Sequence, residues 1–315
     1  MLNKFFSKLT KSIFKLILPS ISKLFLKLRV NRRAINYLEN ESYFSNNKYN
    51  FSEIIKKYLG KDKIISLDVG AQDGFNTDNF FPSRYNNFFK CIFIEPIKSE
   101  AEKIIDKNNV ISKGLWSEIS TKKLYVMDNR LGSSSMFFPD EKKFDIHKIE
   151  KKEFDKFKVT RSLDVECDTI SNLLNDLNIE NLDFLKIDTQ GAEFDILKGI
   201  GNYKPLLIKL EAHTFSMYKN VPSWDKLISF LYDRNYVVID WKGIGRHSTR
   251  IPAELDMLFI PNFDTEEGKK LILKFKEKFV SILLIFGQLS ILKIIMARFN
   301  IKDEEIEKIE DLYFS

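Results

Sequence analysis

The sequence predicts an α/β protein with a mostly parallel sheet, and three observations support this class. Short apolar runs of strand length alternate along the chain with segments of helical periodicity. The composition, 44% hydrophobic and 30% charged, is that of a globular chain. Four of the apolar runs end in acidic residues, which are Asp68, Glu95, Asp188 and Glu211. Because the carboxyl ends of parallel strands meet at one edge of a sheet, these acids are expected at a single ligand-binding edge.

The first segment, residues 1–38, is a basic amphipathic extension. It contains nine Lys or Arg and no acidic residue, and its lysines recur at helical spacing beside an apolar face. Such a helix can lie among the headgroups of an anionic membrane, and residues 1–33 are the expected contact. Charges interrupt every apolar run before the roughly 20 residues needed to span a bilayer. The alternative is a helix packed on the domain with its lysines in water.

The strand expected at residues 64–69 leads into a turn rich in glycine, and Asp68 lies at its end. Glycine permits tight turns and lets a ligand approach the backbone closely. A buried strand that ends in such a turn is typical of a cofactor-binding loop. The turn residues expected to bind are Gly70, Ala71, Gln72 and Gly74.

A second strand is expected at residues 91–94, and it ends at Glu95, 27 positions after Asp68. In a strand–helix–strand unit, an acid at this position can accept both hydroxyl protons of a ribose. The turn lacks the Gly-x-Gly-x-x-Gly pattern of dinucleotide sites, and no Gly-Lys-Ser/Thr follows it. S-adenosylmethionine has a ribose but no phosphate and therefore fits best. Taken singly, an ordinary turn and a solvated strand end would explain these features.

The middle of the chain continues the alternation of strands and helices. A helix is expected at 99–107, strands at 109–113, 123–127 and 162–166, and a helix capped by Asp168 and Thr169 at 170–177. The strand at 123–127 is expected at a sheet edge. The polar stretch 128–160 lacks periodicity and is the expected lid or substrate loop, since long irregular segments in compact domains are often functional.

Two strands of the second half also end in acids. Residues 183–188 end at Asp188, and Gly191 then opens a helix that runs to Gly199. Residues 205–211 end at Glu211, with His213 two positions later. A helix at 224–235 and strands at 236–240 and 255–260 complete the sheet. The uncharged stretch 279–292 is interrupted by Gly287, which weakens a continuous helix, and residues 303–311 form an acidic helix or tail.

These strand ends supply candidates for methyl-transfer chemistry. A hydroxyl group becomes a good nucleophile when it loses its proton, which calls for a base or a metal ion. His213 is the first candidate for the base because imidazole titrates near neutrality; a loop histidine that packs or caps is the alternative. Asp188 and Glu211 could orient His213, hold the acceptor hydroxyl or bind a divalent cation. Asp188 could also contact the sulfonium end of the cofactor.

Four blocks of residues together resemble the FkbM family of S-adenosylmethionine-dependent methyltransferases. They are the turn from Asp68 to Gly74, Glu95-Pro96, the segment Lys186 to Glu193, and Leu210-Glu-Ala-His213. The resemblance covers roughly residues 63–261. It implies a Rossmann-like seven-stranded methyltransferase sheet with helices on both faces and an antiparallel last strand, together with O-methylation of sugars or natural products.

The chain departs from the pattern of this family at two places. Gln72 stands where the family more often has Asn, and it keeps an amide. Thr189-Gln190 stand where the family has Val-Glu, which removes one acid that could contact a substrate or a metal ion. The expected organisation is a basic helical extension at 1–38, the methyltransferase domain at 39–262, and a C-terminal helical extension at 263–315.

Several other classes of function are disfavoured. Cys91 and Cys167 lie in apolar runs, so they are expected to be buried thiols of a cytoplasmic protein, with a peripheral position on the inner membrane face left open. The three histidines are scattered, and no metal ligand is assigned. Nucleic acid is not an expected partner, because basic residues cluster at one terminus. Two alternatives remain, a nicotinamide-dependent oxidoreductase and an inactive membrane-associated binding protein; a homo-oligomer is also left open.

Overall fold

The computed structural model describes residues 50–72, 74, 81–104, 109–147, 149–244, 251–304 and 306. The chain divides into a larger compact unit, Asp62–Asp78 and Asn86–Ile282, and a smaller one drawn from Met1–Lys61, Asn79–Tyr85 and Leu283–Ser315. The basic extension expected at 1–38, with its membrane contact at 1–33, lies outside the described residues. The predicted domain boundaries after residues 38 and 262 stay predictions.

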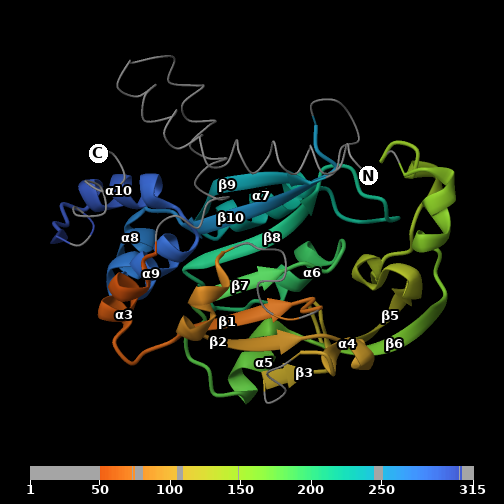
Figure 1. Ribbon diagram of the computed structural model, residues 1–315, viewed down its shortest axis with the longest axis horizontal. Coiled ribbons are helices and arrows are strands. Elements are labelled where there is room, and N and C mark those ends of the chain that lie inside the picture. The colour runs from red at the N-terminus through yellow and green to blue at the C-terminus, as the bar shows by residue number, and fades with distance from the viewer. Residues whose placement is uncertain are drawn as a thin grey trace, which may run out of the picture. The chain divides into compact units, whose positions relative to one another are not determined.

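The larger unit contains a seven-stranded sheet in the order β3-β2-β1-β7-β8-β10-β9. In that order the strands are Val110–Ile111, Phe89–Ile94, Ile64–Val69, Phe184–Ile187, Leu207–His213, Glu254–Pro261 and Tyr236–Ile244. The neighbouring strands from β3 to β8 pair in parallel, whereas β10 pairs antiparallel with both β8 and β9. This topology confirms the predicted sheet and its antiparallel last strand. The arrowheads of the central strands point toward β5 (Ser120–Val126) and β6 (Arg161–Asp168) in Figure 1.

The central strands are buried on both sides, which explains their nearly continuous apolar sequences. All seven residues of β8 are buried. Because successive side chains of a strand point to opposite faces, Ile208, Leu210 and Ala212 join the main core. The alternate residues face the other side, and after Leu207 these are Lys209, Glu211 and His213. One face of β8 is therefore both buried and polar, an arrangement that requires partners for its charges.

Helices flank the sheet (Figure 1), and the cap predicted at Thr169 is present. The Thr169 hydroxyl accepts the Asn172 backbone N–H at the start of α5, and the Thr265 hydroxyl accepts that of Gly268 at the start of α8. The helices of the larger unit are α4 (Lys98–Ala101), α5 (Ile170–Asp176), α6 (Glu193–Lys198), α7 (Trp224–Asp233) and α8 (Glu266–Lys274). The helix expected at 99–107 is shorter than predicted in its described part.

In the part of the chain that the structure describes, the remaining α-helices are α3 (Ser52–Leu59), α9 (Lys276–Ile285) and α10 (Leu289–Arg298), with the short 3-10 helix η1 at Ser83–Phe88. The uncharged stretch 279–292 forms the end of α9 and the start of α10. Gly287 lies between the two helices with φ +68°, so the predicted interruption is present. Among the described residues, no helix combines the length and the apolar character that crossing a bilayer requires.

A second sheet of three strands, in the order β4-β6-β5, corrects the expectation of a simple edge strand near residue 123. Its strands are Gly114–Leu115, Arg161–Asp168 and Ser120–Val126. The stretch 128–160 is also more ordered than predicted, because it holds three 3-10 helices, η3 (Asp128–Ser133), η4 (Glu141–Lys143) and η5 (Lys151–Phe157). Its buried side chains join a small core, which consists of Met127, Phe144, Phe157, Met217 and Tyr218.

Candidate active site

The turn after β1 is held against the neighbouring strands. The backbone N–H groups of Gly70 and Ala71 both donate to the carbonyl of Ile94, at 3.0 and 3.2 Å. Gly70 has φ +78°, and a Cβ atom on it would lie 1.9 Å from the carbonyl oxygen of Asp188. The main reason that position 70 requires glycine is therefore the close approach of the chain at the end of β7. The approach of a ligand would be a further reason. Gly74 has φ +90° with room for a Cβ, so its requirement is conformational.

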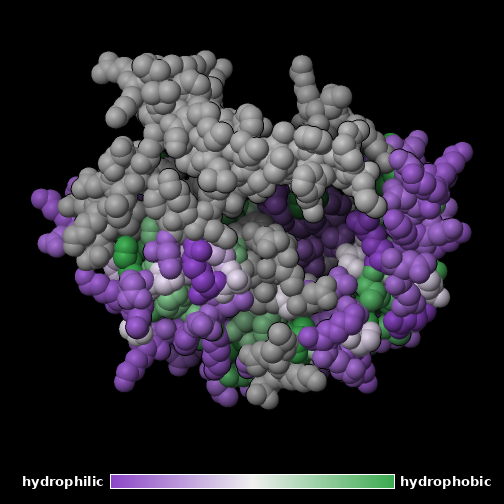
Figure 2. Space-filling view, viewed as in Figure 1, coloured by the Kyte–Doolittle hydropathy of each residue, from purple (hydrophilic) through white to green (hydrophobic). Residues whose placement is uncertain are grey.

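A pocket opens beside this turn at the carboxyl edge of the sheet. Figure 2 shows a hollow beside the carboxyl ends of the central strands, and the residues visible inside it are mostly hydrophilic. The pocket is lined from β1, β2, β4, β7 and the segment 131–136, and its polar residues include Gln72, Glu95, Glu100, Lys186, Asp188 and Gln190. Of the predicted cofactor residues, four belong to this lining: Gly70, Gln72, Glu95 and Asp188. The other three, Asp68, Ala71 and Gly74, lie outside the lining.

Glu95 follows β2 and is the buried acid of this pocket. One of its carboxylate oxygens, Oε1, accepts the backbone N–H of Ile97 at 2.9 Å. The residue is only 5% exposed. Burial raises the pKa of Glu95 to about 7, and the negative charges of Glu100 and Asp68 add to this effect. The Glu95 carboxyl therefore loses its proton near neutral pH, and the resulting carboxylate can accept strong hydrogen bonds from the hydroxyl groups of a ligand.

A ligand with a ribose is expected to bind more weakly as the pH falls from 8 to 6. Two ribose hydroxyls donate best to the ionised carboxylate, and the raised pKa of Glu95 means that protonation removes acceptor capacity in this range. Below a pH of about 7, the dissociation constant of adenosine should rise toward tenfold per pH unit. Calorimetric titration at several pH values measures this. In Glu95→Gln the slope should vanish, and an unchanged slope in that variant would contradict the assignment.

Asp68 lies beneath the pocket as one partner of a buried ion pair. Its Oδ1 accepts from Lys186 Nζ at 3.0 Å, across the β1–β7 pairing that places the two residues opposite each other. Asp68 is fully buried, and Lys186 reaches the pocket wall. The ion pair links β1 to β7, just before the turn that contains Gly70. A direct contact between Asp68 and a cofactor stays a prediction.

The turn after β7 is shaped by Glu193, a residue to which the sequence analysis gave no role. Its carboxylate accepts the backbone N–H of Thr189 at 2.8 Å, the Thr189 hydroxyl at 3.1 Å and the N–H of Gly191 at 3.0 Å. Burial raises the pKa of Glu193 to about 7. The turn needs this support because Gln190 and Gly191 both have positive φ, +59° and +116°. A glutamate in the first turn of a helix can accept backbone N–H groups at the helix start, and this is the feature of the sequence that could have indicated the role of Glu193.

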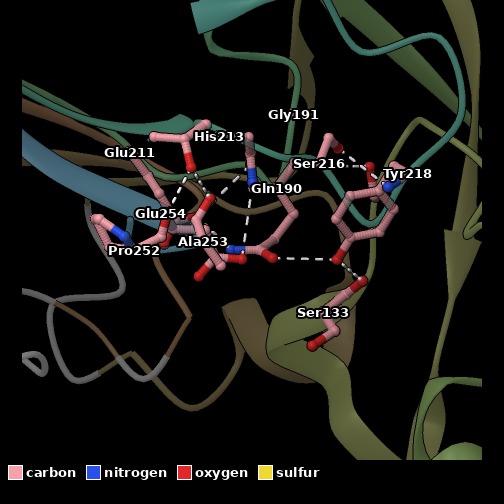
Figure 3. A network of polar contacts seen from close by, with 12 residues as sticks. Ser133, Gln190, Gly191, Glu211, His213, Ser216, Tyr218, Pro252, Ala253 and Glu254 are labelled. Carbon is pink, nitrogen blue, oxygen red and sulfur yellow. Dashed lines mark hydrogen bonds and ion pairs between the residues drawn. The ribbon is translucent and has the colours of Figure 1, made fainter. Parts of the chain in front are cut away.

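Gln190 joins the pocket to the end of β8, as Figure 3 shows. Its side-chain Nε2 donates to Glu211 Oε2 at 2.7 Å and lies 3.4 Å from Asp188 Oδ1. The hydroxyl of Tyr218 lies 3.1 Å from Gln190 Oε1 and 2.8 Å from the Ser133 carbonyl, so it can donate to either oxygen. The amide at position 190 therefore keeps Glu211 hydrogen-bonded where a second acid would repel it.

The predicted catalytic residues Asp188, Glu211 and His213 come together at adjacent strand ends, and Glu254 joins them. His213 lies opposite Glu254 in the β8–β10 pairing. Its Nε2 is 3.8 Å from Glu211 Oε2, and its Nδ1 is 3.7 Å from Glu254 Oε1. Burial lowers the pKa of His213 and raises the pKa of both glutamates. Burial therefore favours the neutral imidazole, the form that a base or a metal ligand requires.

The same three residues, Glu211, His213 and Glu254, form a group that could hold a metal ion. No metal ligand was assigned from the sequence, because His213 has no histidine or cysteine neighbour at a metal-binding spacing. Glu254 was missed because it begins a strand instead of ending one. The antiparallel direction of β10 brings its first residue to the edge where the parallel strands end.

Comparison with known families adds an independent finding. A family model described as the methyltransferase FkbM domain matches residues 68–238. The match begins at Asp68 and ends within β9, so it includes the pocket residues and the acids that end β1, β2, β7 and β8. Glu254 lies beyond it. No curated protein matches the sequence.

Proposed function

Because the chain belongs to the FkbM methyltransferase family, we propose that it transfers the methyl group of S-adenosylmethionine to a hydroxyl group. The proposed acceptor is a sugar of a glycan, a lipid-linked glycan or a natural product. Glu95 is the observation that carries the cofactor assignment, since it is a buried acid at the end of the second strand, beside the turn after the first.

The pocket has the groups that this cofactor would need. Glu95 would accept the hydroxyls of the ribose, and the apolar lining from Pro96, Ile97 and Leu115 suits an adenine ring. The turn at Gly70 would face the amino-acid portion, and Asp188 would lie toward its charged groups. When bound, the cofactor supplies a methyl group on a positively charged sulfur. The residues of the chain supply its orientation, which can account for much of the rate of a transfer that must occur in line.

The acceptor side is proposed beyond Asp188 and Gln190, at the end of β8. Asp188 lines the pocket, and Gln190 connects that wall to Glu211. A hydroxyl group held there would face neutral His213 and two glutamates whose pKa values are raised. Together with the Asp188 carboxylate, these residues can orient an alcohol and take up its proton. Their role in the reaction rests on this placement.

Calorimetric titration with S-adenosylhomocysteine tests the cofactor assignment. Saturable binding is expected for the full chain, and Glu95→Ala should weaken it at least tenfold, since a charge-assisted hydrogen bond contributes about 1.5–3 kcal/mol. Glu166→Ala, on the exposed face of β6, serves as the control and should bind normally. A folded protein without binding would refute the assignment. Binding of reduced nicotinamide dinucleotide instead would favour the oxidoreductase alternative, and cofactor binding without transfer to any acceptor would favour an inactive binding protein.

The location of the protein belongs to the same proposal. We infer a cytoplasmic protein from the two cysteines, Cys91 and Cys167, which are buried and form no disulfide. A peripheral contact with anionic lipid through residues 1–33 is supported by their basic amphipathic sequence alone. A lipid-linked acceptor would agree with such a contact.

A further inference from the structure

We propose that Glu211, His213 and Glu254 bind one divalent transition-metal ion, and that this ion coordinates the acceptor hydroxyl. The first part depends only on the side chains of these three residues. The second part rests on the proposed function, because it requires an alcohol as the acceptor.

The three side chains are placed together by the sheet itself. One ligand atom from each residue can be chosen so that all three lie within 4.8 Å of one another. Glu211 and His213 are two positions apart on β8 and therefore share a face, and Glu254 pairs directly with His213. Ligands carried by paired strands are held more precisely than ligands on loops.

His213 provides the second and independent observation. Its side chain is 2% exposed, and neither ring nitrogen has a hydrogen-bond partner among the residues that the structure describes. The nearest carboxylate oxygens, at 3.8 and 3.7 Å, are too distant for hydrogen bonds. Buried polar atoms without partners are rare in folded proteins and call for an explanation. A cation between the imidazole and the carboxylates would satisfy a ring nitrogen that is otherwise buried without a bond.

The chemistry of the three donors selects the class of ion. Two carboxylates would balance the charge of a dication and suit Mn²⁺, and a neutral imidazole favours Fe²⁺ or Zn²⁺ over Ca²⁺ and Mg²⁺, which prefer oxygen ligands. Gln190 adds an outer contact, because its amide donates to Glu211 Oε2 and fixes the orientation of that carboxylate. Three protein ligands leave coordination positions open for water or a substrate oxygen.

The position of the site connects it with the proposed reaction. Asp188 and Gln190 line the cofactor pocket, and Gln190 hydrogen-bonds the proposed ligand Glu211 (Figure 3). An alcohol that coordinates the ion would lose its proton more readily, and the proton would pass through the Asp188 carboxylate to solvent. The oxygen then forms a bond to the methyl carbon as the carbon–sulfur bond breaks. The electron pair of the broken carbon–sulfur bond stays on sulfur. The products are a methyl ether and S-adenosylhomocysteine, whose sulfur is no longer charged.

Metal titration of the full chain tests the site without any acceptor. After treatment with a chelator, the protein should bind one Mn²⁺ per chain in electron paramagnetic resonance and one Zn²⁺ in equilibrium dialysis, both more tightly than Mg²⁺. Glu254→Gln, which keeps the shape of the side chain, and His213→Ala should each weaken Mn²⁺ binding at least tenfold. His147→Ala removes a histidine outside the cluster and should leave Mn²⁺ affinity unchanged.

Binding of S-adenosylhomocysteine shows whether each variant still folds and keeps the cofactor pocket. A folded wild-type protein that binds no Mn²⁺ or Zn²⁺, or variants that bind them as the wild type does, would overturn the metal site. With an acceptor in hand, chelation should stop methyl transfer and Mn²⁺ should restore it. Transfer that persists in the chelated protein would overturn the role of the ion. Metal binding without S-adenosylhomocysteine binding would leave the site standing and remove the proposed function.

Discussion

Gly70→Ala is expected to lower the free energy of unfolding by about 4 kcal/mol and to abolish binding of S-adenosylhomocysteine. The backbone at position 70 has φ +78°, which a residue with a side chain rarely adopts. The added methyl group would lie 1.9 Å from the carbonyl oxygen of Asp188 and 3.3 Å from Thr189 Cγ2. The Asp188 N–H donates to the Val69 carbonyl at 3.0 Å, so the two strand ends cannot separate without losing this bond. Backbone strain and the clash of the added methyl group therefore both destabilise the Gly70→Ala variant.

Denaturant unfolding monitored by circular dichroism measures this loss, and Gly74→Ala is the matched control. Gly74 also has a positive φ, +90°, but a Cβ there would meet only Ile104 Cγ2 at 3.9 Å. The control is expected to lose about 1–2 kcal/mol from backbone strain alone. The difference between the two variants reports the contact with Asp188. Equal losses would show that the end of β7 does not restrict position 70.

The acids at the strand ends could be predicted because two simple rules apply to them together. A parallel strand buried on both faces reads as a continuous apolar run, and its carboxyl end reaches the edge where ligands bind. Asp68, Glu95, Asp188 and Glu211 each follow such a run, and the structure brings them to one edge. The family match over residues 68–238 confirms the methyltransferase family. Local sequence sufficed here because each strand carries its own signal.

The second sheet and the stretch 128–160 could not be predicted in the same way. The apolar residues of this stretch follow neither the period of a helix nor that of a strand, and so they read as a loop. In the structure, Phe144 and Phe157 pack with Tyr218, which comes from a distant segment. Short 3-10 helices gain most of their stability from such contacts, which a local pattern does not contain.

Hydrogen bonds between neighbouring strand ends also could not be predicted from the local sequence pattern. In the sequence, Gln190 stands in place of an acid and so looks like a lost ligand, whereas in the structure its side-chain Nε2 donates to Glu211 and its side-chain Oε1 lies within reach of the Tyr218 hydroxyl. Glu254 could be assigned to the site only once the register of β10 against β8 was known. A one-residue shift in that register would have turned Glu254 to the opposite face of the sheet.

Glu193→Ala is expected to lower the free energy of unfolding by about 3 kcal/mol at pH 6 and to weaken binding of S-adenosylhomocysteine. Burial raises the pKa of Glu193 to about 7, so at this pH the carboxyl is mostly uncharged and the folded protein avoids most of the cost of a buried charge, while the carboxyl oxygens still accept hydrogen bonds from the turn after β7. Its removal leaves the N–H groups of Thr189 and Gly191 without their acceptor. The positive φ of Gln190 then loses its support, and Asp188 and Gln190, which line the pocket, lose their fixed positions.

Two further variants separate this role from a general effect on α6. Asp195→Ala removes another acid of the same first turn, one that pairs with Lys198 at the surface, and it should cost at most about 1 kcal/mol. Glu193→Gln keeps one carbonyl acceptor but presents an amide to the remaining donors, so its loss should fall between those of the other two variants. Chemical denaturation gives the stabilities, and calorimetry gives the affinities. If Glu193→Ala unfolds as Asp195→Ala does and binds the cofactor product normally, the turn is held by the backbone alone and Glu193 has no positioning role.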